Sequence, residues 1–260
     1  MEWKTAITKV EPNHIHIRGY AIQDLIGKHS FGEVVYLLFK GEMPTPAQGK
    51  LIEAVLVATV DHSVFAPSAC AARFVASGGV PIQSAVAAGL SALGDHHGGA
   101  IEQCQKLLEE GVRRMQAEGK SAEEMAETVL REHRGHHQNG VPTKKRIPGF
   151  GHPYHTADPR TLALFNLARE LKQDGPHIQL AEAIGAKSEV VMGRKLVVNT
   201  DAAQAAVLAE LGFPWQLARG FFVISRAAGL SAHAYEEITR ERPFRAVDLK
   251  EVVYDGPEDR

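Results

Sequence analysis

Four short clusters in this chain hold residues that could carry acid–base or anion-binding chemistry. The first runs from Gly94 to Ala100 and reads GDHHGGA, with His96 and His97 directly before two glycines. Glycines let a backbone approach a ligand closely, and histidine exchanges protons near neutral pH. The same residues could also be solvated side chains of an ordinary loop. No metal site is predicted, because neighbouring histidines diverge and the usual ligand spacings are missing.

The second cluster combines cations, glycines and a histidine over about twenty residues. Its members are Lys144, Lys145, Arg146, Gly149, Phe150, Gly151, His152 and Arg160. Cations before a glycine-rich turn suit a ligand that bears phosphate. Arg160 falls in the first turn of a predicted helix, where a cation opposes the helix dipole and a bound anion is favoured. A solvated basic loop is the alternative.

The third cluster is Thr200-Asp201 at the start of a helix rich in small residues. Asp201 could be the N-cap of this helix, with Gln204 completing a capping box. It could instead be a carboxylate that faces a cleft and acts as a general base. The spacing leaves both interpretations open.

The fourth cluster is Arg226 within the apolar stretch FFVISRAAGL. A charge in such surroundings is strongly unfavourable unless it is paired, so Arg226 either forms an internal salt bridge or binds a carboxylate. Arg219, seven positions earlier, is a competing candidate. His133, His136 and His137 could bind a metal, but their glycine-rich surroundings favour a mobile loop.

The elements that must position these clusters are nearly all helical. Ile15 and Ile17 alternate with polar residues, which predicts a short N-terminal strand that ends at Gly19-Tyr20. Apolar spacing and capping signals predict helices after it, starting with one that a Ser30–Glu33 capping box opens and a second that Ser121 and Glu124 open. Others are expected near residues 47–60, 82–93, 101–117, 159–172, 202–211 and 215–239. The predicted fold class is mainly α.

Composition sets further bounds. The 260 residues are 44% hydrophobic, which is ordinary for a globular protein. Their net charge of −2 gives no overall positive field that would attract nucleic acid or an anionic membrane. Two cysteines are too few for a disulfide framework and favour a reducing compartment. The N-terminus lacks the apolar core of a signal peptide, and no apolar run approaches the roughly 20 residues that span a bilayer. A cytoplasmic location is expected, without nucleic-acid or membrane partners.

Taken in order, the clusters resemble the citrate synthase family from about residue 15 to residue 245. The matching segments are Arg18-Gly19-Tyr20, Glu33-Val34, Gly41-Glu42, Pro44-Thr45, Asp61-His62, His97-Gly98-Gly99-Ala100, Gly149-Phe150-Gly151-His152, Asp158-Pro159-Arg160, Asn199-Thr200-Asp201, Arg226, Ala232-His233 and Arg242-Pro243. The resemblance implies a multi-helix fold with a large helical domain and a smaller, mobile helical part. It implies one catalytic unit over residues 1–260, with the smaller subdomain at roughly 140–225.

The resemblance also implies roles. Asp201 would remove a proton from the methyl carbon of acetyl-CoA, and His97 would donate a hydrogen bond to the thioester oxygen. His152 would polarise the carbonyl of oxaloacetate, or accept the hydroxyl proton of citryl-CoA in the reverse direction. His62, Arg160, Arg226 and Arg242 would form the dicarboxylate site, and Arg242 would cross the interface of a homodimer. Lys144 to Arg146 and Gly149 to Gly151 would meet CoA, which is a substrate here, so no permanently bound cofactor is expected.

Departures from the pattern of full-length citrate synthases favour the lyases of the family over its synthases. The segment between Arg18 and His62 lacks a large helical block of full-length synthases. The compact form and Gly94-Asp95 look more like citryl-CoA lyase and the C-terminal lyase module of ATP-citrate lyase, although those lyases generally carry Phe where His97 stands. We therefore expect retro-Claisen cleavage of citryl-CoA. A compact citrate or 2-methylcitrate synthase and a non-catalytic CoA- or dicarboxylate-binding subunit are the alternatives.

Overall fold

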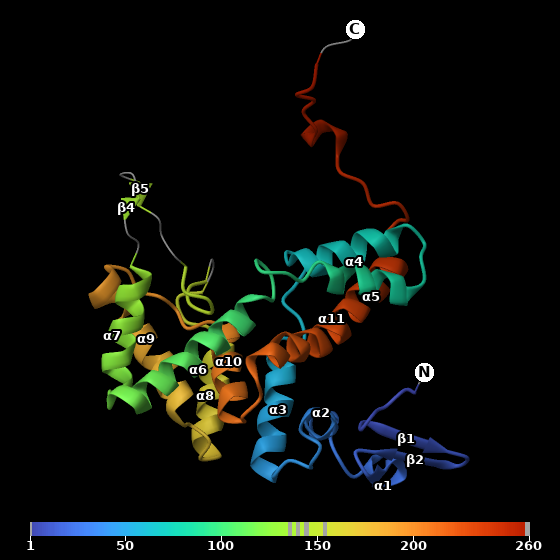
Figure 1. The fold of residues 1–260 in the computed structure, drawn as a ribbon. Helices are drawn as coiled ribbons and strands as arrows, with labels where there is room; N and C mark the ends of the chain where they lie inside the picture. Colours follow the sequence, from blue (N-terminus) through green and yellow to red (C-terminus); the bar gives the residue numbers. More distant parts are fainter. Residues whose placement is uncertain (1, 135–136, 139–140, 143–145, 153–154, 258–260) are drawn as a thin grey trace. The chain divides into compact units, whose positions relative to one another are not determined.

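The computed structural model describes residues 2–134, 137–138, 141–142, 146–152 and 155–257. Helices dominate this part of the chain, as Figure 1 shows, so the prediction of a mainly α fold is confirmed. None of the helices described is both long and apolar enough to cross a membrane. Both cysteines are free.

A small antiparallel sheet lies at the N-terminus. It orders β1 (Thr8–Glu11), β2 (His14–Ile17) and β3 (Tyr20–Ala21), of which only β2 was predicted. The turn between β2 and β3 uses positive φ angles at Arg18 (49°) and Gly19 (90°). The Arg18 guanidinium then donates to the Leu38 carbonyl at 3.1 and 2.7 Å, which ties the sheet to the second helix.

Local signals account for where several helices begin. Capping boxes at Ser30–Glu33, Thr45–Gln48 and Ser121–Glu124 open three of them, because each side chain satisfies a backbone N–H that the first turn leaves unpaired. The helices are α1 (Ile22–Leu25), α2 (Phe31–Lys40), α3 (Pro46–Ala58), α4 (Pro67–Ser77), α5 (Ile82–Ser91), α6 (Ala100–Glu118), α7 (Ala122–His133), α8 (Pro159–Glu170), α9 (Pro176–Met192), α10 (Thr200–Glu210) and α11 (Ala218–Arg240). Short 3₁₀ turns at Trp215–Leu217 and Leu249–Glu251, and the two-residue strands β4 (His137–Gln138) and β5 (Val141–Pro142), complete the assignment.

The chain divides into two compact units, and each is described by itself. The first unit holds residues up to Val60 and from Gly98 to Ser225, and the second holds Asp61–His97 and Arg226–Arg260. The expected smaller subdomain at roughly 140–225 falls within the first unit, and its independence stays a prediction.

Helix α10 is the centre of the first unit and contacts α3, α6, α8 and α9. Its buried positions are mostly alanines, at 202, 203, 205, 206 and 209, and small side chains let the surrounding helices approach closely. A helix enclosed on all sides has little freedom to shift. The residues of its first turn, Asp201 among them, are therefore held in a fixed place in this unit.

The second unit is built from α4, α5 and the C-terminal part of α11 with the segment that follows it. Gly89 of α5 lies so close to its neighbours that a Cβ there would stand 2.8 Å from the Ser68 carbonyl oxygen and 2.9 Å from Leu230 Cδ1. Ala66, Ala69, Ala72 and Leu230 form the apolar cluster around this contact. The unit is thus packed through small residues, like α10 in the first.

Candidate active site

Asp201 opens the first turn of α10 without serving as its cap. The N-cap is Asn199, whose side-chain oxygen accepts the backbone N–H groups of Asp201 at 2.9 Å and of Ala202 at 3.3 Å. The interpretation of Asp201 and Gln204 as a capping box is therefore wrong. Gln204 is instead fully buried and donates to Thr59 Oγ1 at 3.1 Å. Because Asn199 fills the cap, the Asp201 carboxylate is not needed to hold the helix start.

The turn Gly149–Gly151 is bound to the same helix start through the backbone. Asn199 donates its side-chain N–H to the Gly151 carbonyl at 2.9 Å and its backbone N–H to the Gly149 carbonyl at 3.1 Å. Gly149 has a φ of +80°, and a Cβ there would lie 2.7 Å from Cys104 Sγ. Only glycine fits this position, so the turn that leads to His152 and the helix that carries Asp201 are fixed to each other.

His152 has a defined tautomer when its ring is neutral. Its Nδ1 accepts the backbone N–H of His155 at 3.0 Å, which leaves the proton on Nε2. Burial lowers the pKa of His152, the nearby His155 and Arg160 lower it further, and Asp158 partly opposes them. At neutral pH the ring is therefore uncharged and presents Nε2–H as a donor.

Arg160 has a partner two residues away. Its guanidinium binds both oxygens of Asp158, at 2.9 and 2.8 Å, and Asp158 also accepts the backbone N–H of Thr200 at 3.1 Å. Burial would raise the pKa of Asp158, but the hydrogen bonds from Arg160 and its charge outweigh burial and lower it. The carboxylate at the N-cap balances the cation in the first turn, so a bound anion is not required to explain Arg160. Its contact with substrate stays a prediction.

Two further residues of the first unit bear on the site. Burial raises the pKa of the Cys104 thiol, and the negative charge of Asp201 raises it further. The thiol is thus neutral, and it lies against the Gly149 turn. Arg219 forms an ion pair with Glu102 at 2.7 Å, so an internal partner accounts for this competing cation.

His97, in the second unit, ends a tight turn in which Gly94 and His97 exchange backbone hydrogen bonds at 2.8 and 2.9 Å. Its Nε2 lies 2.8 Å from Ser68 Oγ and also accepts the Ser68 backbone N–H at 3.4 Å. Burial lowers the pKa of His97, and the charge of Arg226 lowers it further, so the ring is neutral.

Arg226 sets the direction of the hydrogen bond at Ser68. Its side chain is buried, and Nη1 donates to Ser68 Oγ at 3.5 Å. Because Arg226 can only donate, the Ser68 hydroxyl accepts from it and gives its own proton to His97 Nε2. The neutral imidazole then carries its proton on Nδ1, which becomes its donor. Ser68 was not predicted, since a serine in the first turn of a helix is ordinary.

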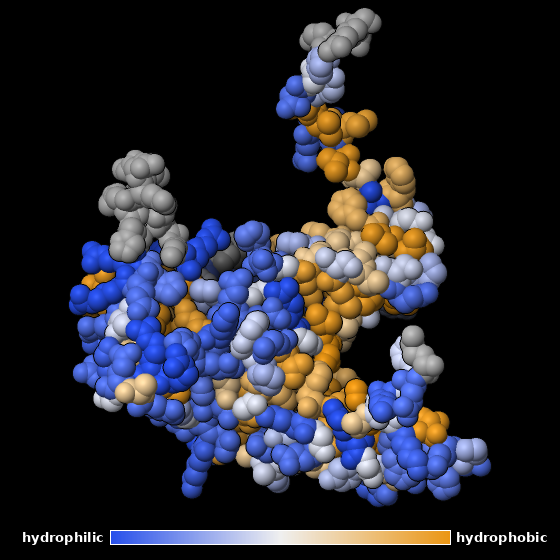
Figure 2. Space-filling model, in the orientation of Figure 1, coloured by the Kyte–Doolittle hydropathy of each residue, from blue (hydrophilic) through white to orange (hydrophobic). Residues whose placement is uncertain are grey.

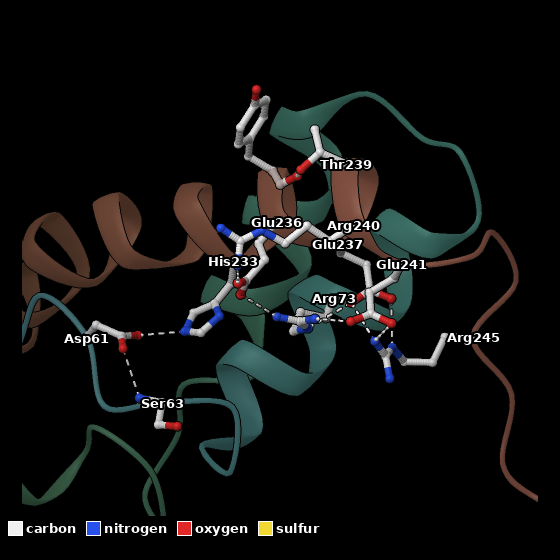
Figure 3. A network of polar contacts seen from close by, with 11 residues as sticks. Asp61, Ser63, Arg73, His233, Glu236, Glu237, Thr239, Arg240, Glu241 and Arg245 are labelled. Atoms are coloured by element: carbon white, nitrogen blue, oxygen red, sulfur yellow. Dashed lines mark hydrogen bonds and ion pairs between the residues drawn. The ribbon is translucent and has the colours of Figure 1, made fainter.

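The loop that carries His62 is held by the contact of Asp61 with His233. His233 Nε2 lies 2.9 Å from Asp61 Oδ1, and Asp61 Oδ2 accepts the Ser63 backbone N–H at 2.9 Å, as Figure 3 shows. Burial would raise the pKa of Asp61, but the Ser63 hydrogen bond and the His233 charge lower it. The His62 ring packs edge-on against Phe65, with centroids 5.0 Å apart.

The remaining predicted residues are distributed as follows. Arg242 is exposed just after α11, and Arg146 is exposed before the Gly149 turn. Lys144, Lys145 and His136 lie outside the described residues, as does the side chain of His137. His133 ends α7, where its Nδ1 lies 2.8 Å from the Val129 carbonyl oxygen. A CoA contact at these cations stays a prediction.

A cavity of about 400 Å³ opens in the first unit between α8, α9 and the strand-like segment before α10. Leu196 to Val198 form one wall, and Val198 makes a backbone bridge with Phe150 of the glycine-rich turn. Lys195, Glu182 and Asp158 supply its charges, while Leu162 and Phe165 supply apolar surface. The size suits part of a small-molecule ligand.

Comparison with known proteins places the chain in a class. The model of the citrate synthase C-terminal domain matches residues 2–50 and 45–246, so the chain belongs to the citrate synthase family, whose enzymes act on acyl-CoA thioesters. Citrate synthase 2 of Bacillus subtilis is 30% identical over 208 residues, which are 79% of this chain and 51% of that protein. The glyoxysomal citrate synthase of Cucurbita maxima is 29% identical over 222 residues, which are 82% of this chain and 39% of that protein. The chain thus spans about half the length, or less, of these relatives.

Two solved structures sharpen the comparison. Citryl-CoA lyase from Hydrogenobacter thermophilus is 42% identical, with a TM-score of 0.87 over 99% of this chain and 96% of that one. ATP citrate lyase from Methanosaeta concilii, solved with (3S)-citryl-CoA, is 20% identical with a TM-score of 0.74 over 100% of this chain and 42% of that one. The second likeness concerns the fold alone, whereas the first extends over nearly the whole of both chains.

Proposed function

We propose that this chain is a citryl-CoA lyase, which cleaves citryl-CoA or a close 3-hydroxy-3-carboxyacyl-CoA to acetyl-CoA and oxaloacetate. The observation that carries the proposal is the 42% identity to citryl-CoA lyase of Hydrogenobacter thermophilus over 99% of this chain and 96% of that one. The side chains described above supply the groups that this reaction needs.

The cleavage is a retro-Claisen reaction in which protons and electrons balance. The hydroxyl proton of citryl-CoA passes to the Nδ1 lone pair of His152, which gives up the His155 N–H and becomes an imidazolium. The bond between the methylene carbon and the hydroxyl-bearing carbon breaks, and its electron pair forms the enolate of acetyl-CoA. His97 Nδ1–H donates to the enolate oxygen, where the negative charge develops. Asp201, protonated in this direction, gives its proton to the carbon and completes the methyl group. In condensation the same residues act in reverse order.

The remaining residues would bind the two ends of the substrate. His62, Arg160, Arg226 and Arg242 would hold the carboxylates, since guanidinium groups pair with them in a bidentate manner. The turn from Gly149 to Gly151 and the cavity beside it would meet CoA, together with the cations from Lys144 to Arg146.

We propose a homodimer in which Arg242 reaches the partner's site. Large apolar side chains stand exposed along the segment that follows α11, visible as orange atoms in Figure 2. They include Phe244 (82% exposed), Leu249 (84%) and Val253 (85%). Exposed apolar surface of this kind favours contact with another protein surface.

A compact citrate or 2-methylcitrate synthase is the second candidate, and His97 is the observation that favours it. The synthases of the family keep this histidine. A synthase would also hydrolyse the citryl thioester and release CoA.

The test is the product balance of the purified protein. Supplied with citryl-CoA, it should form one oxaloacetate and one acetyl-CoA for each substrate consumed, with no free thiol. Oxaloacetate is measured by coupled reduction to malate, and free CoA with a thiol reagent. Stoichiometric release of CoA, from citryl-CoA or from acetyl-CoA plus oxaloacetate, would overturn the lyase in favour of the synthase. If nothing is converted and no deuterium exchanges into the methyl group of acetyl-CoA, the chain is a binding subunit.

A further inference from the structure

We propose that Glu237 is a positioning residue, which fixes the substrate-binding Arg242 by clamping the turn after α11 through Arg245 and Arg73. The inference rests on the proposed function, because it deepens the role given there to Arg242. It concerns residues of the second unit only.

The clamp is a buried carboxylate between two guanidinium groups. The side chain of Glu237 is 0% exposed. Its Oε1 accepts Arg245 Nε at 2.6 Å, its Oε2 accepts Arg245 Nη2 at 2.8 Å, and Arg73 Nε lies 2.7 Å from Oε2. Figure 3 shows the three side chains converging from α11, α4 and the C-terminal segment. A buried charge persists only when it is paired in this way. Glu237 is the buried centre of the arrangement, and the more exposed Glu241 lies farther away, 3.4 Å from Arg73 Nη2 and 3.3 Å from Arg245 Nη2.

The turn between α11 and Arg245 is closed by the backbone as well. The Phe244 N–H donates to the Ser77 carbonyl at 2.8 Å, and the Arg245 N–H donates to Ser77 Oγ at 3.1 Å. Phe244 has a φ of +64°, which is strained for a large side chain and persists only where neighbouring contacts enforce it. The clamp thus holds a conformation that the chain would otherwise leave.

Arg242 lies inside this closed turn. Its backbone is held between the end of α11 at Arg240 and the anchor at Arg245, while its side chain is exposed. Because Arg245 binds both oxygens of Glu237, the pair fixes the orientation of the turn as well as its distance from α11. Without the anchor, Arg242 would have to be ordered when the substrate binds, and that ordering weakens binding.

The neighbouring carboxylate provides a matched control. Glu236 also contacts Arg73, at 2.8 Å, and it pairs with Arg240 at 2.7 Å. Its side chain is 37% exposed, in contrast to the enclosed side chain of Glu237. Replacing Glu236 therefore removes a charge from the same network while the pair of Glu237 and Arg245 stays in place.

The experiment compares Glu237→Gln and Glu236→Gln, each in the wild-type and the Arg242→Ala backgrounds, in steady-state cleavage of citryl-CoA. We expect Glu237→Gln to raise KM about tenfold and to change kcat by less than about threefold, since uniform binding is lost. In the Arg242→Ala background the same substitution should raise KM by less than about twofold, because its effect passes through Arg242. Glu236→Gln should change KM by less than about twofold in either background.

An equal rise in KM in both backgrounds would show that Glu237 acts on folding alone, and an unchanged KM in Glu237→Gln would also overturn the inference. If Glu237→Gln does not fold, Arg245→Lys keeps the charge but loses the bidentate pair, and it should raise KM about threefold through Arg242 only. If the wild-type protein cleaves no citryl-CoA, the proposed function fails. The clamp is then tested by measuring the affinity of the same variants for citrate by calorimetry. Glu237→Gln should weaken citrate binding in the wild-type background and much less in the Arg242→Ala background.

Discussion

Asp201 and His152 are held by backbone amides and the Asn199 side chain, whereas His97 is held through Ser68 and Arg226. In our proposal, Arg242 is held through the Glu237 clamp. In the first unit the Gly149 turn, Asn199 and the start of α10 are joined mostly by neutral hydrogen bonds, to which the Asp158 carboxylate adds a bond from the Thr200 N–H. In the second unit, the His97 tautomer depends on Arg226 through Ser68. The two sets of predicted site residues are thus positioned by different interactions.

The difference predicts how each set fails. Neutral backbone bonds respond little to pH, so the first set is disturbed mainly by changes in packing. Ion pairs depend on the protonation of their carboxylates, so the second set is disturbed by charge removal and by acid. The substitutions below separate the two modes.

Removal of the base should have the largest effect. Asp201→Asn should lower kcat for citryl-CoA cleavage by about 10³-fold, because general acid–base catalysis contributes on this scale. The thermal midpoint should stay within about 2 °C, because Asn199 and not Asp201 caps the helix. Activity assays and thermal unfolding check the two halves of this prediction. A large loss of stability would show that Asp201 is a structural residue.

Packing of the first set is tested at Gly149. Gly149→Ala should destabilise the protein by about 2–4 kcal/mol, because it adds a strained φ to a close contact with Cys104. Gly119→Ala is the matched control, since Gly119 has a φ of +66° but a methyl group added there would meet no described atom within 4 Å. It should lose only about 1–2 kcal/mol in denaturant unfolding. Equal losses would mean that the close contact of Gly149 with Cys104 does not add to the cost of the substitution.

The second set is tested at Ser68. Ser68→Ala removes the hydroxyl that gives its proton to His97 Nε2, so the imidazole loses the bond that orients it. We expect kcat to fall about 10- to 100-fold, as is usual when the partner of a functional histidine is removed. Ser91→Ala, which loses only a bond to the Ala87 carbonyl within α5, should leave kcat unchanged. Equal kcat in both variants would contradict the assigned tautomer.

Acid should weaken the Glu237 clamp. Hydrogen bonds from Arg245 lower the pKa of Glu237, burial opposes this, and the charge of Arg73 lowers it further. A carboxyl whose pKa is lowered by folding contributes stability above its unfolded pKa of about 4.3 and loses it as the pH falls through the folded value. The difference in thermal midpoint between wild type and Glu237→Gln should therefore be full at pH 6 and shrink below about pH 4. A difference that is constant with pH would show that the carboxylate charge does not matter.

The sequence alone predicted those helices whose start is marked by residues that lie close together in the chain. The capping boxes at Ser30 and Ser121 and the Asp158-Pro159 start of α8 lie within a few residues, so the sequence alone identifies them. Helices α1, α4 and α9 were not predicted; α1 has only four residues, and α4 and α9 lack a side-chain cap. Strand β1 was missed because it pairs with β2 while its own side chains are mostly exposed.

The site residues likewise include some that the sequence predicted and some that it did not. The family pattern supplied Asp201, His97 and His152, and their roles stay predictions that the geometry supports. The contact of Ser68 with His97 and the pairing of Glu237 with Arg73 were not predicted, because Ser68 lies 29 positions from His97 and Glu237 lies far along the chain from Arg73. Such partners are joined only by folding, and no local pattern marks them. Asn199 was seen as part of a motif, but Asp201 was an equally good cap on spacing alone.

The most direct test of the account is deuterium exchange from solvent into the methyl group of acetyl-CoA, followed by mass spectrometry in wild type and His97→Phe. In the proposed function Asp201 exchanges the proton of the methyl carbon and His97 donates to the thioester oxygen, so the exchange reports on both roles. We predict that wild type exchanges the methyl protons and that His97→Phe slows the exchange by about 10²-fold or more. Exchange at the wild-type rate in His97→Phe would contradict the proposed role of His97 as the donor that stabilises the enolate.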